Sequence, residues 1–345
     1  MKTTHHNNSM LLIVFVALVT LMNQSANSQD SKHSCGPENI HSQSVNYGQA
    51  IDIDGNTYKT VIINDQIWFS ENLKVTRFQN GEAIPNVSDS AAWAGLPGPG
   101  MCSYRNDSTY DCPYGKLYNF YVASDPRNPC PNGWRVPTMA DLYKLIFFLD
   151  PNANAQQPGN TPNIAGGYLK STGFAYWRTP NTNATNISGF SAIPNGGRND
   201  AGKFSISNDA AASYWLSTLA GASPGKSMGF FLELAFPQEF AVRNAYWANY
   251  GACIRCVTDR NSMNAEDTID IKSEVQMTQT QDALCLQLQP TFLRTQYSII
   301  DVNGRTMLEG LIQDNFVISI GDLPNGSYFL TFPRATLQSV QFVKK

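Results

Sequence analysis

Histidine is nearly missing from this sequence. Its four histidines are His5, His6, His33 and His41, so residues 42–345 contain none. Catalytic Ser-His-Asp and Cys-His systems need an imidazole as general base, and most catalytic zinc sites use histidine ligands. We therefore expect neither kind of site in the folded part of the chain, and we expect no bound metal and no cofactor.

Charged side chains are also scarce. They make up 15% of the sequence, against roughly 25% in an average soluble domain. The net charge at pH 7 is -3, whereas nucleic-acid binding requires a basic surface. The composition therefore excludes nucleic acid as a partner and disfavours anionic membrane surfaces. The polar surface must be built largely from Asn, Ser, Thr, Gly and Tyr, as in many extracellular proteins.

A long hydrophobic run is absent as well. The longest one, residues 10–22, is shorter than the roughly 20 residues of a membrane-spanning helix. It follows Lys2 and precedes Ala26 and Ser28, two small residues spaced as signal peptidase prefers. Residues 1–28 are therefore predicted to be a signal peptide, followed by a polar leader over residues 29–44. We expect a protein that is secreted or placed on the outer cell surface, and not an integral membrane protein.

The seven cysteines agree with an oxidising compartment, where disulfides persist. Six lie between residues 35 and 256, and six cysteines allow 15 pairings. Cys253 and Cys256 are three residues apart on a predicted strand, so they should not pair with each other. A thioredoxin-like redox role for them would need a helix after the strand, which the surrounding residues do not favour. Cys102 and Cys112 flank one polar loop, and we expect them to close it.

The strongest local signal predicts a helix that begins after Pro137. Thr138 can cap it, and Asp141 can complete a capping box three residues later. Apolar residues then recur at the spacing of one helix face, at Leu142, Leu145, Ile146 and Leu149. The pattern predicts a buried helix of about three turns that ends at Asp150.

Other segments are assigned by composition and turn signals. A second main helix is predicted over residues 115–123, and a short helix capped at Ser88 or Asp89 runs through Trp93. Residues 151–210 are rich in Asn, Gly and Pro and are predicted to be irregular and loop-rich. Strands are predicted at residues 58–63, 67–69, 214–218, 229–234 and 252–257, with a turn at Asn64 and Asp65 between the first two.

Six phrases, in order, resemble those of the Fibrobacter succinogenes major paralogous domain, a family of secreted bacterial modules. They span residues 45–258 and read QIWFSENLK (66–74), NGEAIPNV (80–87), YGKLYNFY (114–121), WRVPT (134–138), AGGYLKSTG (165–173) and IRCV (254–257). The resemblance implies a C-type-lectin-like fold related to formylglycine-generating enzymes, and no established activity. It also implies that Cys130 pairs with Cys256. Cys35 and Cys253 then remain, by elimination, as a third pair.

The enzymes of that fold can be compared with this chain directly. They oxidise a substrate cysteine with a cysteine pair that follows a Gly-Gly turn. The matching turn here is residues 195–198, and no cysteine follows it in residues 199–204. Among the carboxylates, Asp141 already has a capping role, and Glu71 beside Trp68 is expected to make a buried hydrogen bond. The remaining acidic residues stand in no context that singles one out for catalysis, so we expect no enzyme.

Aromatic side chains are the remaining candidates for a ligand site. Tyr246, Trp247 and Tyr250 lie among small polar residues, and Trp177 and Tyr110 lie in loop-rich segments. Such rings can form a platform for a glycan or for a surface protein. The alternative is that most of them belong to the core. The loop and strand phrases of calcium-dependent lectins do not occur, and Asp107, Asp111 and Asp125 are too dispersed for a calcium site.

The composition changes near residue 259. Residues 259–278 are polar and are predicted to be a linker, and residues 279–345 carry a compact pattern of strands with an Asn-Gly turn at Asn303. Three phrases resemble the type A C-terminal sorting domain of the type IX secretion system of Bacteroidetes: DVNGR (301–305), LPNGSY (323–328) and FVKK (342–345). The resemblance implies that the secretion machinery is a partner. The sorting-signal residues are Asp301, Gly304, Arg305, Pro324, Gly326, Tyr328, Lys344 and Lys345.

The alternative for residues 279–345 is an ordinary accessory β domain. If this part is removed after export, Cys285 leaves with it, and an even six cysteines remain. The predicted fold class is α+β: a C-type-lectin-like domain with two main helices and an irregular loop-rich region, followed by a small all-β sandwich. The predicted function is non-catalytic binding of a glycan or a surface protein. The alternatives are a structural coat or adhesin component without a discrete ligand and, third, a secreted enzyme.

Overall fold

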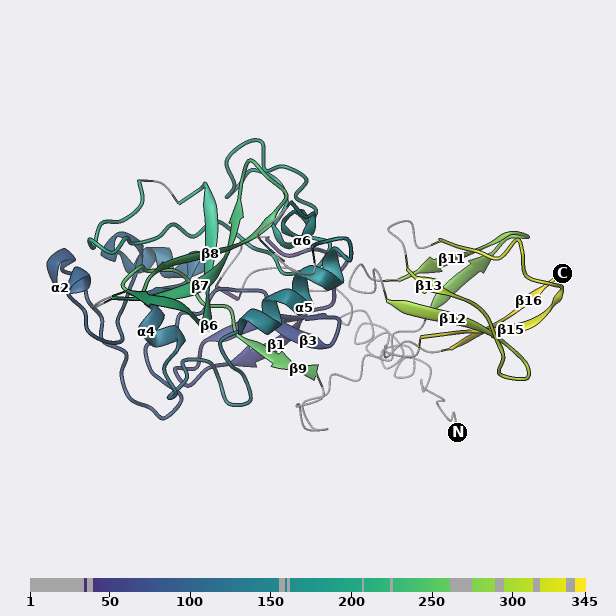
Figure 1. Ribbon diagram of the computed structural model, residues 1–345, viewed down its shortest axis with the longest axis horizontal. Coiled ribbons are helices and arrows are strands. Elements are labelled where there is room, and N and C mark those ends of the chain that lie inside the picture. Colours follow the sequence, from purple (N-terminus) through teal and green to yellow (C-terminus); the bar gives the residue numbers. More distant parts are fainter. Residues whose placement is uncertain are drawn as a thin grey trace, which may run out of the picture. The chain divides into compact units, whose positions relative to one another are not determined.

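A computed structural model describes most of the chain (Figure 1). The described residues are 34–35, 40–154, 159, 162–206, 208–223, 226–260, 275–288, 295–312, 317–332 and 339–345. The predicted signal peptide, residues 1–28, lies outside them, as does most of the predicted linker, residues 259–278. No helix among the described residues is long and apolar enough to cross a membrane.

The first sheet brings the two ends of the family-like region together. Its strands pair antiparallel in the order β1-β2-β3-β9. Asn64 adopts a positive φ of 59° in the two-residue turn that connects β2 to β3, which confirms the turn predicted there. Trp68 of β3 pairs with Val257 of β9. The bounds are Gly48–Ile51 for β1, Thr57–Ile63 for β2, Gln66–Phe69 for β3 and Val257–Asp259 for β9.

The second sheet is the longest, and its strands lie side by side in Figure 1. It consists of β6 (Ala211–Ser223), β7 (Lys226–Ala235) and β8 (Ala241–Trp247), all antiparallel. Alternate residues of a strand share one face, so β7 contributes Phe231 and Glu233 to one face and Phe230 and Leu232 to the other. A third sheet is the short pair β4 (Met101–Cys102) and β5 (Leu117–Tyr118).

The predicted helix after Pro137 is confirmed as α5, Met139–Leu149. Thr138 and Asp141 form the capping box, and the four predicted apolar residues are buried in the core. The Asp141 carboxylate also accepts hydrogen bonds from Arg135 and from the Gln66 amide of β3. One buried carboxylate therefore fixes the start of α5 against the first sheet. The helix capped by Asp89 is confirmed as α2, Ser90–Ala94.

The second main helix, predicted over residues 115–123, is wrong. Residues 117 and 118 form β5, and only one helical turn follows, α4 (Phe120–Ala123). Gly115 has a φ of +73°, and a Cβ there would lie 2.8 Å from the carbonyl oxygen of Leu73. Asn119 is extended and donates its amide to Gly98 while capping α4. Contacts distant in sequence therefore override the helical pattern.

The predicted fold class, α+β with two main helices, is consequently wrong. Strands hold 36% of the described residues and helices 13%, and the strands form five sheets. The protein is mostly β, with one helix longer than five residues among those described, α5. The other helical segments are short: η1 (Tyr104–Asn106), η2 (Ser108–Tyr110), α3 (Asp111–Tyr114) and α6 (Ala165–Leu169).

Buried cations hold the loop-rich region in place. The Lys170 ammonium donates to the carbonyls of Thr182, Ala235 and Gln238, and burial lowers its pKa to about 8. The Arg198 guanidinium donates to three carbonyls and lies 4.5 Å from the centre of the Trp93 ring. Backbone oxygens in and beside the loops thus accept hydrogen bonds from a charged donor.

The C-terminal strands form two antiparallel sheets, β10-β11-β14 and β13-β12-β15-β16. Both sheets contribute to one apolar core that includes Leu284, Ile299, Ile318, Leu330 and Phe342. The predicted turn at Asn303 is confirmed: it joins β12 to β13, and Gly304 has a φ of +80°. The bounds are Gln276–Gln279, Ala283–Gln287, Gln296–Asp301, Thr306–Leu311, Val317–Ser319, Gly326–Thr331 and Val340–Lys344 for β10 to β16.

Candidate functional site

Two disulfides cross-link the N-terminal domain. Cys130 pairs with Cys256 at a Cα–Cα distance of 5.9 Å, as the family resemblance implies. Cys35 pairs with Cys112 at a Cα–Cα distance of 5.6 Å. The predicted pairs Cys102–Cys112 and Cys35–Cys253 are therefore wrong. Cys102 and Cys253 are buried free thiols, and Cys285 is a half-buried free thiol.

Strand register explains why the two buried thiols do not pair. Cys102 lies opposite Leu117, and the bridge between Tyr118 and Ala252 places Cys253 on the other side of Leu117. Two residues separated by an intervening strand are about 9 to 10 Å apart, and a disulfide needs Cα atoms within about 7 Å. Burial raises the pKa of Cys102 to about 11 and raises that of Cys253 further. Such thiols are poor nucleophiles.

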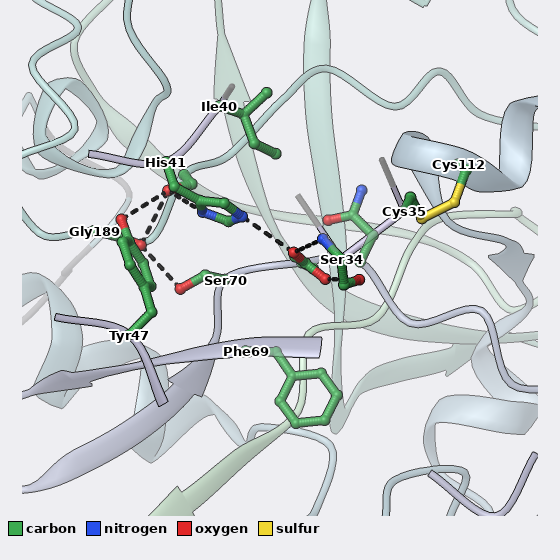
Figure 2. A network of polar contacts seen from close by, with 12 residues as sticks. Ser34, Cys35, Ile40, His41, Tyr47, Phe69, Ser70, Cys112 and Gly189 are labelled. Carbon is green, nitrogen blue, oxygen red and sulfur yellow. Dashed lines mark hydrogen bonds and ion pairs between the residues drawn. A yellow bond between two sulfur atoms is a disulfide. The ribbon is translucent and has the colours of Figure 1, made fainter. Parts of the chain in front are cut away.

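A buried polar network surrounds His41 (Figure 2). The imidazole Nε2 lies 3.1 Å from a carboxylate oxygen of Glu71, and Nδ1 lies 3.1 Å from the Ser191 hydroxyl. The Glu71 carboxylate also accepts hydrogen bonds from the backbone N–H and the hydroxyl of Ser34. The predicted buried hydrogen bond of Glu71 is therefore confirmed. Burial lowers the pKa of His41, against the opposing effect of Glu71.

His41 corrects two expectations. It is 5% exposed and lies inside the domain, so the folded part of the chain does contain a histidine. Ile40 and Val45 are buried as well, so the end of the predicted polar leader belongs to the domain. The disulfide between Cys35 and Cys112 and the Glu71 carboxylate attach this segment to the rest of the fold.

Ser191, His41 and Glu71 are linked in the sequence of contacts seen in a catalytic triad, serine to histidine to carboxylate. The Ser191 hydroxyl, however, already makes hydrogen bonds to other residues. It accepts from the Asn186 amide (3.0 Å), donates to the Gly189 carbonyl (3.1 Å) and lies 3.3 Å from the Tyr47 hydroxyl. Ser191 is 0% exposed. A nucleophile must reach a substrate carbonyl. The Ser191 hydroxyl instead joins His41, at the end of the predicted leader, to the loop at residues 186–191 through hydrogen bonds.

The five predicted ligand-binding aromatics do not form one surface. Trp177 is buried, and its indole N–H donates to the carbonyl of Ala192 (3.0 Å) and to Ser171. Tyr110 is half-buried against Tyr104, with ring centres 5.3 Å apart. Trp247 lies on the other face of β8 from Tyr246, with the Lys226 ammonium over its ring. For these three rings the core alternative describes the structure better than the platform does.

Tyr246 and Tyr250 do come together. Their ring centres are 4.5 Å apart and their planes differ by 24°. A hydrogen bond from the Tyr250 N–H to the Trp247 carbonyl (2.8 Å) makes the turn that folds Tyr250 back beside Tyr246. Phe231 of β7 lies beneath, 4.9 Å from the Tyr246 ring and 6.2 Å from the Tyr250 ring. Tyr246 is 38% exposed.

Two polar residues share this face. Asn244 pairs with Phe231 across β7 and β8, and Glu233 is two residues along β7 from Phe231. We call the set Tyr246, Tyr250, Phe231, Asn244 and Glu233 the Tyr246 face. Glu233 is half-buried and has no hydrogen bond or ion pair to any described residue. Burial raises its pKa, because nothing compensates the carboxylate for lost water.

The Tyr250 hydroxyl is a second polar group without a hydrogen bond to any described residue. Burial raises its pKa, and Tyr246 and Glu233 raise it further. It lies against Gly197, where a Cβ would be 2.4 Å from the hydroxyl oxygen. The turn at Gly196 and Gly197 therefore makes room for this tyrosine. A lone acidic residue in the apolar phrase GFFLEL is the sequence signal that could have singled out Glu233.

The predicted sorting residues gather at one end of the sheet β13-β12-β15-β16. Asp301 pairs with Tyr328, and Gly326 pairs with Lys344. The Asp301 carboxylate accepts the backbone N–H groups of Asn303 and Arg305, which shapes the turn. The Lys344 ammonium is buried on the carbonyls of Ile320 and Gly321. Tyr328 donates to the Pro324 carbonyl, Gly304 occupies the turn, and Arg305 and Lys345 are exposed.

Within the described ranges, no group of three His, Cys, Asp or Glu side chains could hold a metal ion. Neither the curated proteins nor the solved structures gave a match to this chain. A family profile does match: the Fibrobacter succinogenes major domain, over residues 61–258. That match covers more than half of the 345 residues. It includes both cysteines of the Cys130–Cys256 disulfide. The chain therefore belongs to the Fibrobacter succinogenes major domain family.

Proposed function

We propose that this protein is an exported, non-catalytic binding module whose ligand contacts the Tyr246 face. The observation that carries the proposal is an exposed ring, Tyr246, stacked on Tyr250 beside a half-buried carboxylate that has no described partner. Burying an uncompensated carboxylate costs stability. Such a group is typical of a binding site, where a ligand supplies the missing hydrogen bonds.

The surroundings of the Tyr246 face support binding without catalysis. Glu233 is the only charged side chain that β7 and β8 direct to that face, since Lys226 and Arg243 lie on the other one. Hydrolysis of a glycosidic bond generally requires two carboxyl groups facing each other across the bond. A single acceptor beside an aromatic ring is instead sufficient to orient and hold a ligand.

Two sequence features support export to the cell surface. The hydrophobic run at residues 10–22 and the small residues after it match a signal peptide. The phrases that resemble a type IX sorting domain converge at one end of a single sheet. We propose that the secretion machinery is the partner of this C-terminal domain and that the N-terminal domain is the delivered cargo.

The binding proposal is tested with the purified protein on printed arrays of oligosaccharides and of bacterial surface proteins. We expect binding to at least one array, weakened in Tyr246→Ala and unchanged in Phe174→Ala. Phe174 is a matched control because it is an exposed aromatic residue, 62% exposed, that lies outside the Tyr246 face. Absence of binding on both arrays, together with self-association in analytical ultracentrifugation, would overturn the proposal in favour of a structural coat component.

The export proposal is tested in a bacterium that has the type IX system. Deletion of residues 279–345 should leave the protein inside the cell envelope, while the full chain reaches the surface or the medium. Protease accessibility on intact cells measures this. Surface delivery of the truncated chain would show that the C-terminal domain is an accessory β domain.

A further inference from the structure

The arrangement of the rings on the Tyr246 face limits the shape of its ligand. The planes of Phe231 and Tyr250 differ by 12°, and those of Tyr246 and Tyr250 by 24°. Aromatic cages for ammonium groups surround the cation with several ring faces. The planes of Phe231 and Tyr246 differ by 35°, so the three rings pack against one another and do not enclose a cation, and Tyr246 is the ring of the three that is exposed, at 38%. A flat, weakly polar ligand surface fits that ring better than a cation does.

The polar groups beside the ring determine the ligand's hydrogen bonds. An ionised carboxylate has only acceptor sites, about four of them, and those of Glu233 are unused by the described residues. The Asn244 side-chain oxygen accepts the Ala245 N–H (3.0 Å), while its amide N–H groups make no hydrogen bond to described residues. The Tyr250 hydroxyl is also unpartnered. The ligand must therefore offer several donors and at least one acceptor.

Charge limits the ligand further. The cationic side chains of β7 and β8, Lys226 and Arg243, lie on the opposite face, over Trp247 and Phe230. No Lys or Arg of these two strands faces Glu233, so neither strand offers a cation to offset the repulsion between Glu233 and a carboxylate or phosphate on the ligand. An uncharged ligand is favoured.

We propose that the Tyr246 face is a subsite for an uncharged pyranose sugar. The C–H face of the sugar stacks on the Tyr246 ring, and neighbouring sugar hydroxyls donate to the Glu233 carboxylate. The Asn244 amide and the Tyr250 hydroxyl complete the hydrogen bonds. This inference rests on the proposed function and names the ligand class for the same surface.

The test measures binding of six oligosaccharides to the full-length purified protein by isothermal titration calorimetry. The uncharged probes are cellohexaose, xylohexaose, mannohexaose, laminarihexaose and chitohexaose, and the charged probe is hexagalacturonate. We expect at least one uncharged probe to bind and hexagalacturonate not to bind. Tyr246→Ala should weaken binding about tenfold, and Glu233→Gln about three- to tenfold, as expected for one stacking contact and one charge-assisted hydrogen bond.

Three controls separate a lost contact from a lost fold. Phe174→Ala should bind as the unaltered protein does. Glu233→Gln and Tyr246→Ala should unfold cooperatively in calorimetry, and Glu233→Gln should not lower the melting temperature. Affinity of the unaltered protein should also fall as Glu233 is protonated at acidic pH, and Glu233→Gln should remove that dependence.

Several results would overturn the sugar subsite. They are no binding of any uncharged probe at millimolar concentration, equal affinity in Glu233→Gln, or tighter binding of hexagalacturonate. If surface proteins bind through Tyr246 while all sugars fail, the subsite is wrong and the proposed function stands. If nothing on either array depends on Tyr246, both are wrong.

Discussion

Two glutamates near aromatic rings, one buried and one half-buried, differ in their hydrogen bonding in this molecule. Glu71 is 1% exposed and has partners for its oxygens in His41 and in Ser34. Glu233 is less buried yet has no hydrogen-bond partner among the described residues. A satisfied carboxylate stabilises the fold around it, whereas an unsatisfied one costs stability. Glu71 therefore stabilises the domain, whereas the Glu233 carboxylate is available to a ligand.

The largest expected effect comes from removing the satisfied carboxylate. Glu71→Ala leaves the buried His41 imidazole and the Ser34 N–H without their carboxylate partner. We expect the free energy of unfolding to fall by about 3 kcal/mol or more. Urea unfolding followed by tryptophan fluorescence measures it. Glu233→Ala is the matched control and should change that free energy by less than about 1 kcal/mol; equal losses in the two variants would contradict the comparison.

The next effect concerns the covalent attachment of the leader segment. Replacing Cys35 and Cys112 together by Ser removes a disulfide that spans 77 residues of sequence. We expect a loss of about 2 to 4 kcal/mol and, because Ser34 is no longer held beside Glu71, a smaller additional loss when Glu71→Ala is introduced. A double-mutant cycle gives this coupling. Strictly additive losses would show that the disulfide does not support the network.

The two regions should also respond oppositely to pH. His41 has a lowered pKa in the folded state, so below its ordinary value of 6.5 the unfolded chain binds more protons and stability falls. Glu233 has a raised pKa, so the folded chain binds a proton first as the pH falls toward 4.5, and stability rises. Glu71, Lys59, Arg255 and Tyr47 surround His41.

Unfolding free energies measured between pH 7.5 and 5 test this. His41→Gln should flatten the loss on acidification, and Glu233→Gln should steepen it. A pH profile that neither variant changes would show that other groups dominate.

The smallest expected effect is a gain in stability. Glu233→Gln at pH 7 removes a poorly solvated charge without changing the shape of the side chain, so we expect the protein to become more stable by up to about 1 kcal/mol. Chemical denaturation at pH 7 measures the gain, with Glu82→Gln as a control at an exposed carboxylate that is ion-paired with Arg127. A loss of stability in Glu233→Gln would mean that the carboxylate has a structural partner.

Features coded by neighbouring residues were predicted from the sequence. The capping box and apolar face of α5 lie within residues 138–149, and the turns at Asn64 and Asn303 depend on one or two residues. The segment at residues 115–123 has a helical pattern too, but Gly115 and Asn119 are fixed by Leu73 and Gly98, which lie outside it. Local sequence cannot reveal such contacts.

The candidate site was predicted in part for the same reason. Tyr246 and Tyr250 were identified because they are aromatic residues among small polar ones, and one turn brings them together. Trp177 gave a similar signal but is buried, because its indole N–H finds a carbonyl at Ala192. The burial of Glu233 and of His41 depends on which strands and loops pack over them in the folded chain. Burial of that kind is a property of the assembled fold.

The pairing of β3 with β9 has a consequence for how the chain folds while it is synthesised. The last strand of the domain ends at Asp259, and Arg255 just before it donates to the carbonyls of Phe69, Phe190 and Ser191. A chain emerging from the ribosome lacks these contacts until about three quarters of its residues have been synthesised. The first sheet can therefore be completed only after its last strand, β9, has been synthesised.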